Sequence, residues 1–260
     1  MFRHLHIVAC SPRTGTTLLH EVMVTCFAVD KHYDHEIRFH LVTGKDGETV
    51  ITKRPKDTMY MPAVLDDDPE LFVIYLLRDP RDTICSRHGK DKSIYYSNIR
   101  LWRQMHGYAR QLAGHERFLE VRYEDFVTDP DATQRMIMDK FPWLKEKHRF
   151  SEYHEYAVVS EKSRTAMHSV RPIAPTSVGV WTKNPGRIKA QQMLHGSLTP
   201  ELIECGYETS GDWEKVLEDV EPDTTRSLYP EKLAFWRRIS QALDARRKVA
   251  RYRRMRRKSS

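Results

Sequence analysis

The alternation of apolar and polar stretches along the chain predicts strands that follow one another through helices. Short apolar runs predict strands, and apolar residues three or four positions apart predict helices. The predicted strands are His4–Ala9, Thr49–Thr52, Leu71–Leu77 and Phe118–Tyr123. The predicted helices are Thr16–Phe27, Thr58–Leu65, Asp82–Arg87, Ile94–Leu112 and Asp131–Phe141. Strands that alternate with helices favour an α/β fold with a parallel sheet flanked by helices.

The continuous run Leu71–Leu77 shows no polar alternation, which is typical of a parallel strand covered on both faces. The stretch Ser151–Ser197 is polar and interrupted by prolines, so it predicts loop and irregular structure. A final helix is expected from about Pro230. We therefore predict one α/β domain over residues 1–225 and a helical, basic extension over residues 226–260.

Net charge is distributed unevenly along the 260 residues. The segment Arg237–Lys258 holds eleven Lys or Arg residues and one acid, so it carries +10, whereas the whole chain carries only +7. The rest of the chain is therefore mildly acidic, at −3. Such a tail is typical of a segment that contacts an anionic glycan, a membrane surface, nucleic acid or another partner, or of a solvated terminal helix.

Other features of the sequence bear on the location of the protein and on the tail. No apolar run approaches the roughly 20 residues that span a bilayer, and the N-terminus is too polar for a signal peptide. The four cysteines form no CxxC pair, which favours reduced thiols. We expect a cytoplasmic protein. The basic extension also contains Leu233, Trp236, Ile239 and Leu243, which lie three to four residues apart. This spacing predicts an amphipathic helix that packs its apolar face on the body.

The loop Ser11–Thr17 lies between a predicted strand and a predicted helix. Gly15 allows close approach of the backbone, and a helix N-terminus supplies unpaired N–H groups, so the loop predicts a phosphate or sulfate cradle. Arg13 adds a guanidinium that can donate to two oxygens. A plain Ser/Thr helix cap is the structural alternative.

The nucleoside triphosphatase loop is a poor fit to this segment. That motif requires Gly, four residues, and then Gly-Lys-Ser/Thr. Here Cys10 replaces the first Gly and Thr16 replaces the Lys. A kinase of that type would lack its main phosphate-binding lysine.

A second cationic segment follows the apolar run. Arg78 comes directly after Leu77, at the carboxyl end of a predicted central strand, where open α/β sheets bind ligands. Ser86 stands eight residues further on and is expected on the following helix, which Pro80 would begin.

Together these motifs resemble the sulfotransferase superfamily. The matching segments are Pro12-Arg13-Thr14-Gly15-Thr16-Thr17, Leu77-Arg78-Asp79-Pro80-Arg81-Asp82 with Ser86, Arg122-Tyr123-Glu124-Asp125-Phe126, and Ser177-Val178-Gly179-Val180-Trp181-Thr182-Lys183. They stand in the order that the family has and span about residues 5 to 185. The resemblance implies a P-loop-like parallel sheet and transfer of a sulfuryl group from 3′-phosphoadenosine 5′-phosphosulfate to a hydroxyl or amine acceptor, such as a carbohydrate or small metabolite.

The resemblance also implies roles for individual residues. The 5′-phosphosulfate would be held by Arg13, Thr14, Gly15, Thr16 and Thr17. The 3′-phosphate would be held by Arg78 and Ser86. The adenine would lie near Tyr123, and Ser177 and Lys183 would close over the nucleotide.

Transfer also requires a base for the acceptor and positive charge for the leaving oxygen. Lys53 and Arg13 are the cationic candidates, and no metal is expected. Glu36, in a position similar to the glutamate of carbohydrate- and protein-modifying members, is the candidate base. A nearby histidine is the other candidate, and a surface ion pair between Glu36 and Arg38 is the alternative without catalysis.

Two other functions stay open at this point. One is a small-molecule kinase with an atypical P-loop. The other is a catalytically silent nucleotide-binding scaffold whose basic tail docks a partner. We expect no specific nucleic acid, because no nucleic-acid-binding fold accompanies the tail.

Overall fold

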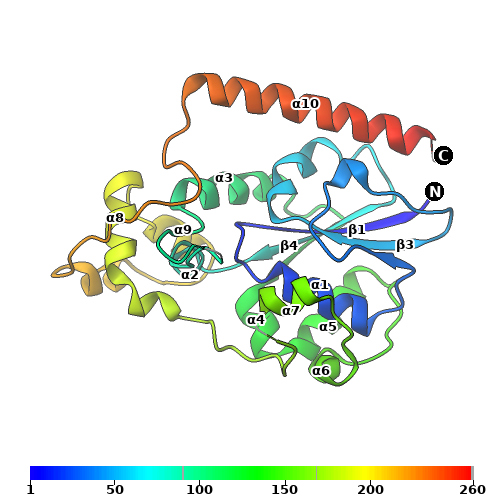
Figure 1. Ribbon diagram of the computed structural model, residues 1–260, viewed down its shortest axis with the longest axis horizontal. Coiled ribbons are helices and arrows are strands. Elements are labelled where there is room, and N and C mark those ends of the chain that lie inside the picture. Colours follow the sequence, from blue (N-terminus) through cyan, green and yellow to red (C-terminus); the bar gives the residue numbers. More distant parts are fainter. Residues whose placement is uncertain (90, 168, 259–260) are drawn as a thin grey trace.

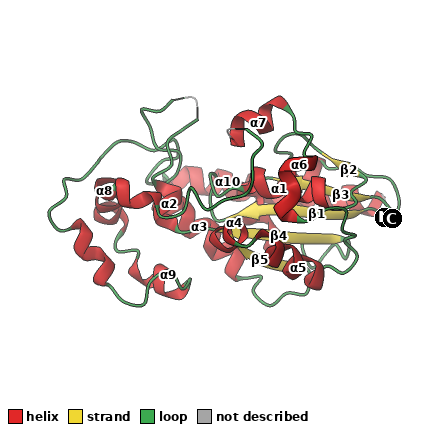
Figure 2. Cartoon of the chain, turned by 90° about the horizontal axis from the view of Figure 1, so that it is seen from below, coloured by secondary structure: helices red, strands yellow, loops and turns green. Residues whose placement is uncertain are grey.

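Five parallel strands form one sheet in the order β2-β3-β1-β4-β5 in the computed structural model, which describes residues 1–89, 91–167 and 169–258 (Figures 1 and 2). The strands are β1 (Arg3–Ala9), β2 (Lys31–His32), β3 (Thr49–Lys53), β4 (Leu71–Leu77) and β5 (Phe118–Arg122). Ile7 of β1 pairs with Lys53 on one side and with Ile74 on the other. The predicted parallel α/β fold is confirmed. Among the strands of the described residues, only the two-residue β2, too short to show a pattern, was not predicted.

Helices cover both faces of this sheet (Figure 1). One face carries α1 (Thr16–Cys26), α4 (Tyr123–Thr128), α5 (Pro130–Lys140), α6 (Tyr153–Tyr156) and α7 (Glu161–Met167). The other carries the 3-10 helix η2 (Pro55–Ala63), α3 (Ile99–Arg110) and the long α10 (Phe235–Lys258). Two short 3-10 turns are η1 (Phe39–Leu41), between β2 and β3, and η3 (Phe150–Glu152), directly before α6.

Strand β4 explains why its sequence is apolar at every position. Ile74 and Leu76 pack in the core beneath α1, α4 and α5, whereas Val73, Tyr75 and Leu77 pack in the core beneath η2, α3 and α10. Successive side chains point to opposite faces of a strand, and both faces of β4 are covered. Neither face of the strand is therefore open to solvent.

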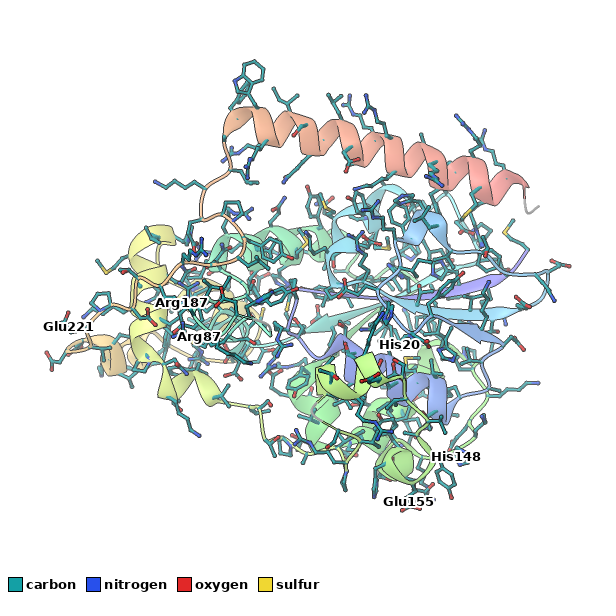
Figure 3. The ribbon with its side chains drawn as sticks, viewed as in Figure 1. His20, Arg87, His148, Glu155, Arg187 and Glu221 are labelled. Carbon is teal, nitrogen blue, oxygen red and sulfur yellow. The ribbon has the colours of Figure 1, made fainter. Side chains whose placement is uncertain are left out.

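A smaller helical lobe stands beside the carboxyl end of the sheet (Figures 1 and 2). It consists of α2 (Pro80–Ile84), η4 (Val180–Lys183), α8 (Pro185–His195), α9 (Thr199–Glu204) and η5 (Asp212–Leu217), with its own apolar cluster. Arg87 and Arg187 both lie over the ring of Tyr95, at 3.7 and 4.2 Å from its centroid, and Figure 3 shows the two arginines in this lobe.

The prediction of irregular structure for Ser151–Ser197 was wrong, because this stretch contains α6, α7, η4 and α8. The helices α6 and α7 are four and seven residues long, too short to show a clear periodicity. Tertiary contacts hold α7: the Ser163 hydroxyl donates to the Glu21 carboxylate of α1 at 2.7 Å.

The predicted packing face of the final helix was also wrong. Trp236 is 76% exposed and Leu243 is 49% exposed, whereas Val249 and Tyr252, in the basic half of α10, are buried on the body. The helix is present, but its body-facing side begins further along the chain. None of the helices in the described part of the chain is both long and apolar enough to cross a membrane. The boundary between residues 225 and 226 stays a prediction.

Candidate active site

The loop between β1 and α1 curls back at the carboxyl end of the central strand. Arg13 and Gly15 both have left-handed backbone angles, with φ of 73° and 100°. No described side chain caps the N-terminus of α1 at Gly15, so the free N–H groups of its first turn keep their capacity to bind an anion. An added Cβ on Gly15 would lie 2.6 Å from a ring carbon of Tyr123, so only glycine fits here.

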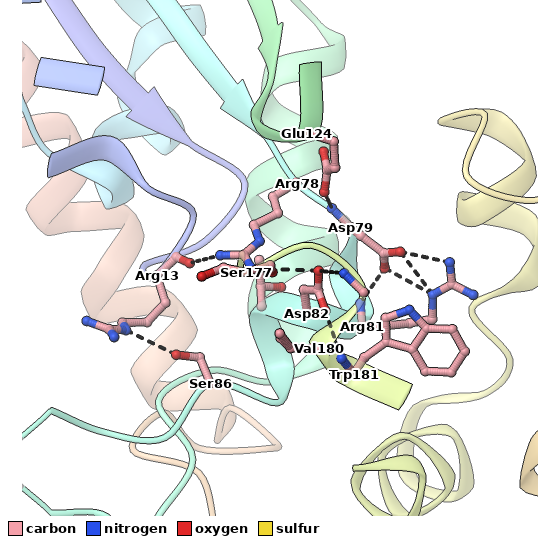
Figure 4. Close-up of polar contacts among 12 residues, drawn as sticks. Arg13, Arg78, Asp79, Arg81, Asp82, Ser86, Glu124, Ser177, Val180 and Trp181 are labelled. Atoms are coloured by element: carbon pink, nitrogen blue, oxygen red, sulfur yellow. Dashed lines mark hydrogen bonds and ion pairs between the residues drawn. The ribbon is translucent and has the colours of Figure 1, made fainter. Parts of the chain in front are cut away.

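Arg78 follows β4, the strand next to β1, and its guanidinium reaches the same loop. Its Nη1 donates to the Arg13 carbonyl at 3.1 Å, and its Nη2 donates to the Ser177 carbonyl (Figure 4). The guanidinium also lies 4.3 Å from the ring centroid of Tyr123. Its Nε is buried and has no hydrogen-bond partner among the described residues. An arginine held in this way, with a free donor, is suited to bind an anion.

Arg13 and Ser86 connect the two motifs. The Arg13 Nε donates to the Ser86 hydroxyl at 3.1 Å (Figure 4). The sequence predicted Ser86 on the helix after β4, and this was wrong. The helix α2 ends at Ile84, so Ser86 lies two residues beyond it. The cationic loop and the segment after β4 therefore form one continuous surface.

Asp82 fastens the segment after residue 176 to this surface. Its carboxylate accepts the N–H groups of Gly179 and Trp181, both at 2.9 Å, and lies 3.6 Å from Nη2 of Arg78 (Figure 4). Burial raises the pKa of Asp82, and the Arg78 charge opposes this rise. Asp82 thus holds Ser177 against Arg78.

One cavity of about 490 Å³ unites most of the predicted residues. Its lining includes Arg13, Gly15, Thr16, Thr17, Glu36, Lys53, Arg78, Ser86, Tyr123 and Ser177. The volume lies within the roughly 300–1,000 Å³ that is usual for small-molecule sites. The residues that the motifs single out separately along the sequence therefore meet at one place.

Two predicted residues lie outside this cavity. Thr14 is fully buried, and its hydroxyl donates to the Ser11 carbonyl at 2.5 Å, so its side chain stabilises the loop. Lys183 is exposed at the end of η4 and does not line the cavity.

Lys53 lies at the end of β3, buried beside the start of α1. Its Nζ donates to the Thr17 hydroxyl at 2.6 Å. Burial lowers the pKa of Lys53, and the charges of Glu36 and Glu21 oppose this effect. An ammonium in this position supplies positive charge directly beside the anion-binding loop.

Glu36 lies on an exposed segment before η1 and lines the cavity. Among the ion pairs of the described residues, none joins it to Arg38. Of the three nearby histidines His32, His35 and His40, only His35 lines the cavity, where its Nε2 lies 2.7 Å from Nζ of Lys162. Glu36 and His35 are therefore the two candidate bases that the fold brings to the site.

Several lining residues were not assigned individually from the sequence. They are Asp34, Tyr96, Tyr153, Lys162, Ser163 and Arg171. Lys162 belongs to α7 and Arg171 to the loop that follows, both within the stretch predicted to be irregular. The only signal in the sequence was the presence of basic residues there, which does not distinguish a site from a solvated surface.

A comparison with protein-family models agrees with the resemblance. The model of the Sulfotransferase family matches residues 24–143, which supports the resemblance to the sulfotransferase superfamily. No curated protein sequence is significantly similar to the chain.

Three solved structures illustrate the structural likeness. The sulfotransferase domain of the Synechococcus PCC 7002 olefin synthase is 16% identical, with a TM-score of 0.47 over 70% of this chain and 87% of its own. The sulfotransferase domain from the curacin biosynthetic pathway is 15% identical, with a TM-score of 0.45 over 94% of this chain and 98% of its own. A retinol dehydratase complex with androsterone and the inactive cofactor PAP is 12% identical, with a TM-score of 0.36 over 96% of this chain and 80% of its own. At these scores the likeness carries no argument about activity.

Proposed function

We propose that the protein transfers a sulfuryl group from 3′-phosphoadenosine 5′-phosphosulfate to a hydroxyl or amine of an acceptor such as a carbohydrate or small metabolite. The observation that carries the proposal is that both cationic motifs open into one cavity. Arg78 donates to the Arg13 carbonyl at 3.1 Å, so a single nucleotide with phosphates at both ends can engage both residues. The match of residues 24–143 to the Sulfotransferase family model supports the transferase class.

The proposed binding of the nucleotide follows from the positions of the hydrogen-bond donors that line the cavity. The N-terminus of α1 with Gly15, Thr16 and Thr17 binds the 5′-phosphosulfate, because helix N-termini bind anions. Arg78 and Ser86 bind the 3′-phosphate. A phosphate oxygen then accepts a hydrogen bond from the buried Nε of Arg78, which has no partner among the described residues. Tyr123 lies beside the adenine, and Ser177 closes over the nucleotide.

The proposed chemistry is a displacement at sulfur. The acceptor oxygen or nitrogen forms a bond to sulfur, and the bond from sulfur to the bridging oxygen of the 5′-phosphate breaks. The electron pair of that bond stays on the phosphate oxygen, where Lys53 and Arg13 stabilise the developing charge. The Glu36 carboxylate accepts the proton of the acceptor. The proposal assigns no metal, because these two side chains supply the positive charge.

The donor half of the proposal is tested by calorimetric titration with 3′-phosphoadenosine 5′-phosphate beside adenosine 5′-monophosphate. We expect the bisphosphate to bind much more tightly, since only it engages both ends of the cavity. Equal affinities would contradict the two-ended site.

The transfer half is tested with labelled donor, a broad panel of acceptors and the variant Glu36→Gln. We expect the variant to keep the affinity for the bisphosphate and to lose at least roughly 100-fold in turnover, because a general base contributes about that much. Asp34→Asn is the matched control, since Asp34 is an exposed acid on the same cavity. Unchanged turnover in Glu36→Gln would remove Glu36 as the base.

Two other results would replace the proposed function. Donor binding without transfer to any acceptor would favour a silent scaffold. Turnover of ATP that requires Mg²⁺ would favour a kinase.

A further inference from the structure

One side of α10 is fixed to the body of the protein. Val249 and Tyr252 are buried, the Tyr252 hydroxyl donates to Asp68, and Arg256 Nε lies 2.6 Å from the same carboxylate. Arg253 pairs with Asp67 at 2.7 Å. These contacts fix the rotation of the helix about its own axis, so they also decide which side chains face the solvent.

The opposite side of α10 presents apolar side chains to water in its first half. Trp236, Ile239 and Leu243 recur at intervals of three and four residues and are 76%, 38% and 49% exposed. Phe235 is 67% exposed, with its ring centroid 5.4 Å from that of Trp236. Figure 3 shows side chains along the upper side of α10 that point away from the body of the protein. A contiguous exposed patch with two aromatic rings indicates a surface that binds something.

The same side of the helix is basic in its second half. Continuing the spacing of three or four from Leu243 leads to Arg247, Ala250 and Arg254, all of which are exposed. The one acid of the helix, Asp244, pairs with Lys248 and lies off this line. We name the line Trp236–Ile239–Leu243–Arg247–Ala250–Arg254 the outer stripe. It joins an apolar half to a basic half along one face of a rod about 36 Å long.

The chemistry of the outer stripe distinguishes its occupants. Nucleic acid would pair with the arginines and leave the apolar half exposed to water. A second copy of the chain would bring two segments of +10 together, which is repulsive. An anionic phospholipid surface satisfies both halves, because tryptophan, phenylalanine and leucine enter the interface while arginines meet the headgroups.

We propose that α10 lays the outer stripe on an anionic phospholipid surface and so docks the enzyme there. The cavity stays accessible in this arrangement, because no described residue of α10 lines it. The inference therefore does not depend on the proposed reaction, and it adds a membrane surface as the partner of the basic helix.

The test is flotation of the whole protein with phosphatidylcholine vesicles, with and without phosphatidylserine. We expect the protein to float only with the anionic vesicles and to dissociate as salt is raised. Trp236→Ser with Ile239→Ser is expected to weaken binding at least roughly tenfold through lost apolar burial. Arg247→Gln with Arg254→Gln is expected to weaken it roughly 25-fold, about fivefold for each charge.

Matched controls separate the stripe from general surface effects. Met193→Ser removes another exposed apolar side chain, on α8, and Arg135→Gln removes an exposed arginine on α5. Both are expected to bind vesicles as the unchanged protein does. Thermal unfolding of every variant checks that the fold is intact.

Three outcomes would overturn the inference. If the unchanged protein does not float with anionic vesicles, or if both pairs of stripe variants bind as it does, the lipid surface is excluded. Alternatively, light scattering shows a dimer that Trp236→Ser dissociates while vesicles do not bind, and a second copy is then the occupant.

Discussion

Replacement of Arg78 by Met tests the proposed binding of a 3′-phosphate by this residue. Arg78 is only 7% exposed, donates to the carbonyls of Arg13 and Ser177, and stacks on Tyr123. Methionine keeps much of the unbranched stem and removes the guanidinium, so the change removes the charge with a limited loss of packing.

The magnitude follows from the bonds that the phosphate would lose. A hydrogen bond to a charged group contributes about 1.5–3 kcal/mol, and Arg78 keeps at least one buried donor, Nε, without a described partner. For this one bond we therefore expect a loss of about 1.5–3 kcal/mol in binding of 3′-phosphoadenosine 5′-phosphate. This corresponds to a rise in Kd of roughly 10- to 160-fold.

The assay is calorimetric titration of both proteins with the bisphosphate and with adenosine 5′-monophosphate. The monophosphate lacks the 3′-phosphate, so its Kd is expected to change less than about threefold. Chemical denaturation of Arg78→Met measures the structural cost separately, because Arg78 also holds the Ser177 segment. If both nucleotides lose affinity equally, Arg78 does not read the 3′-phosphate and the assignment of the two ends is refuted.

Two further changes test the loop and the lobe. Gly15→Ala is expected to destabilise the fold by at least about 1 kcal/mol more than Gly114→Ala, because at Gly15 the Tyr123 ring must move. Gly114 is the control, since it shares a left-handed φ but has nothing within 4 Å of its added Cβ. Equal losses of stability in chemical denaturation would contradict the steric argument. Burial alone would raise the pKa of Asp223, but hydrogen bonds from Thr225 and Tyr95 lower this pKa from its usual 3.8 to about 2. A carboxylate with a lowered pKa stabilises the fold above about pH 4 and loses this effect as the pH falls toward about 2. Asp223→Asn is therefore expected to lower the free energy of unfolding near pH 7 by about 1–2 kcal/mol, allowing for the 32% exposure of the side chain, and to match the unchanged protein below about pH 2; a difference that is constant with pH would exclude this linkage.

Local sequence was sufficient for four of the five strands and for the position of the loop after β1. The run Leu71–Leu77 predicted its strand at both boundaries, because a strand covered on both faces must be apolar throughout. The loop from Ser11 to Thr17 was predicted because its chemistry depends on neighbours in the chain: a glycine, a helix N-terminus and an arginine. Arg78 was placed correctly at the carboxyl end of β4 by the same local logic.

The tertiary structure decided how distant segments meet. Lys162 reaches the cavity because Ser163 ties α7 to Glu21 of α1, a contact between residues 142 positions apart that no local pattern encodes. The exposed Trp236 is a second case in which local sequence did not decide a tertiary contact. The spacing of Trp236, Ile239 and Leu243 showed that one face of the helix is apolar, but whether that face packs on the body depends on Tyr252 and Arg256 finding Asp68.

The sequence by itself determined which cationic residues follow β1 and β4, because this depends only on neighbours in the chain. That Arg13 and Arg78 line one cavity was decided only when β1 and β4 paired side by side and their carboxyl ends came together. Pairing of parallel strands joins residues far apart in the chain, so its outcome depends on the whole core and not on any one segment.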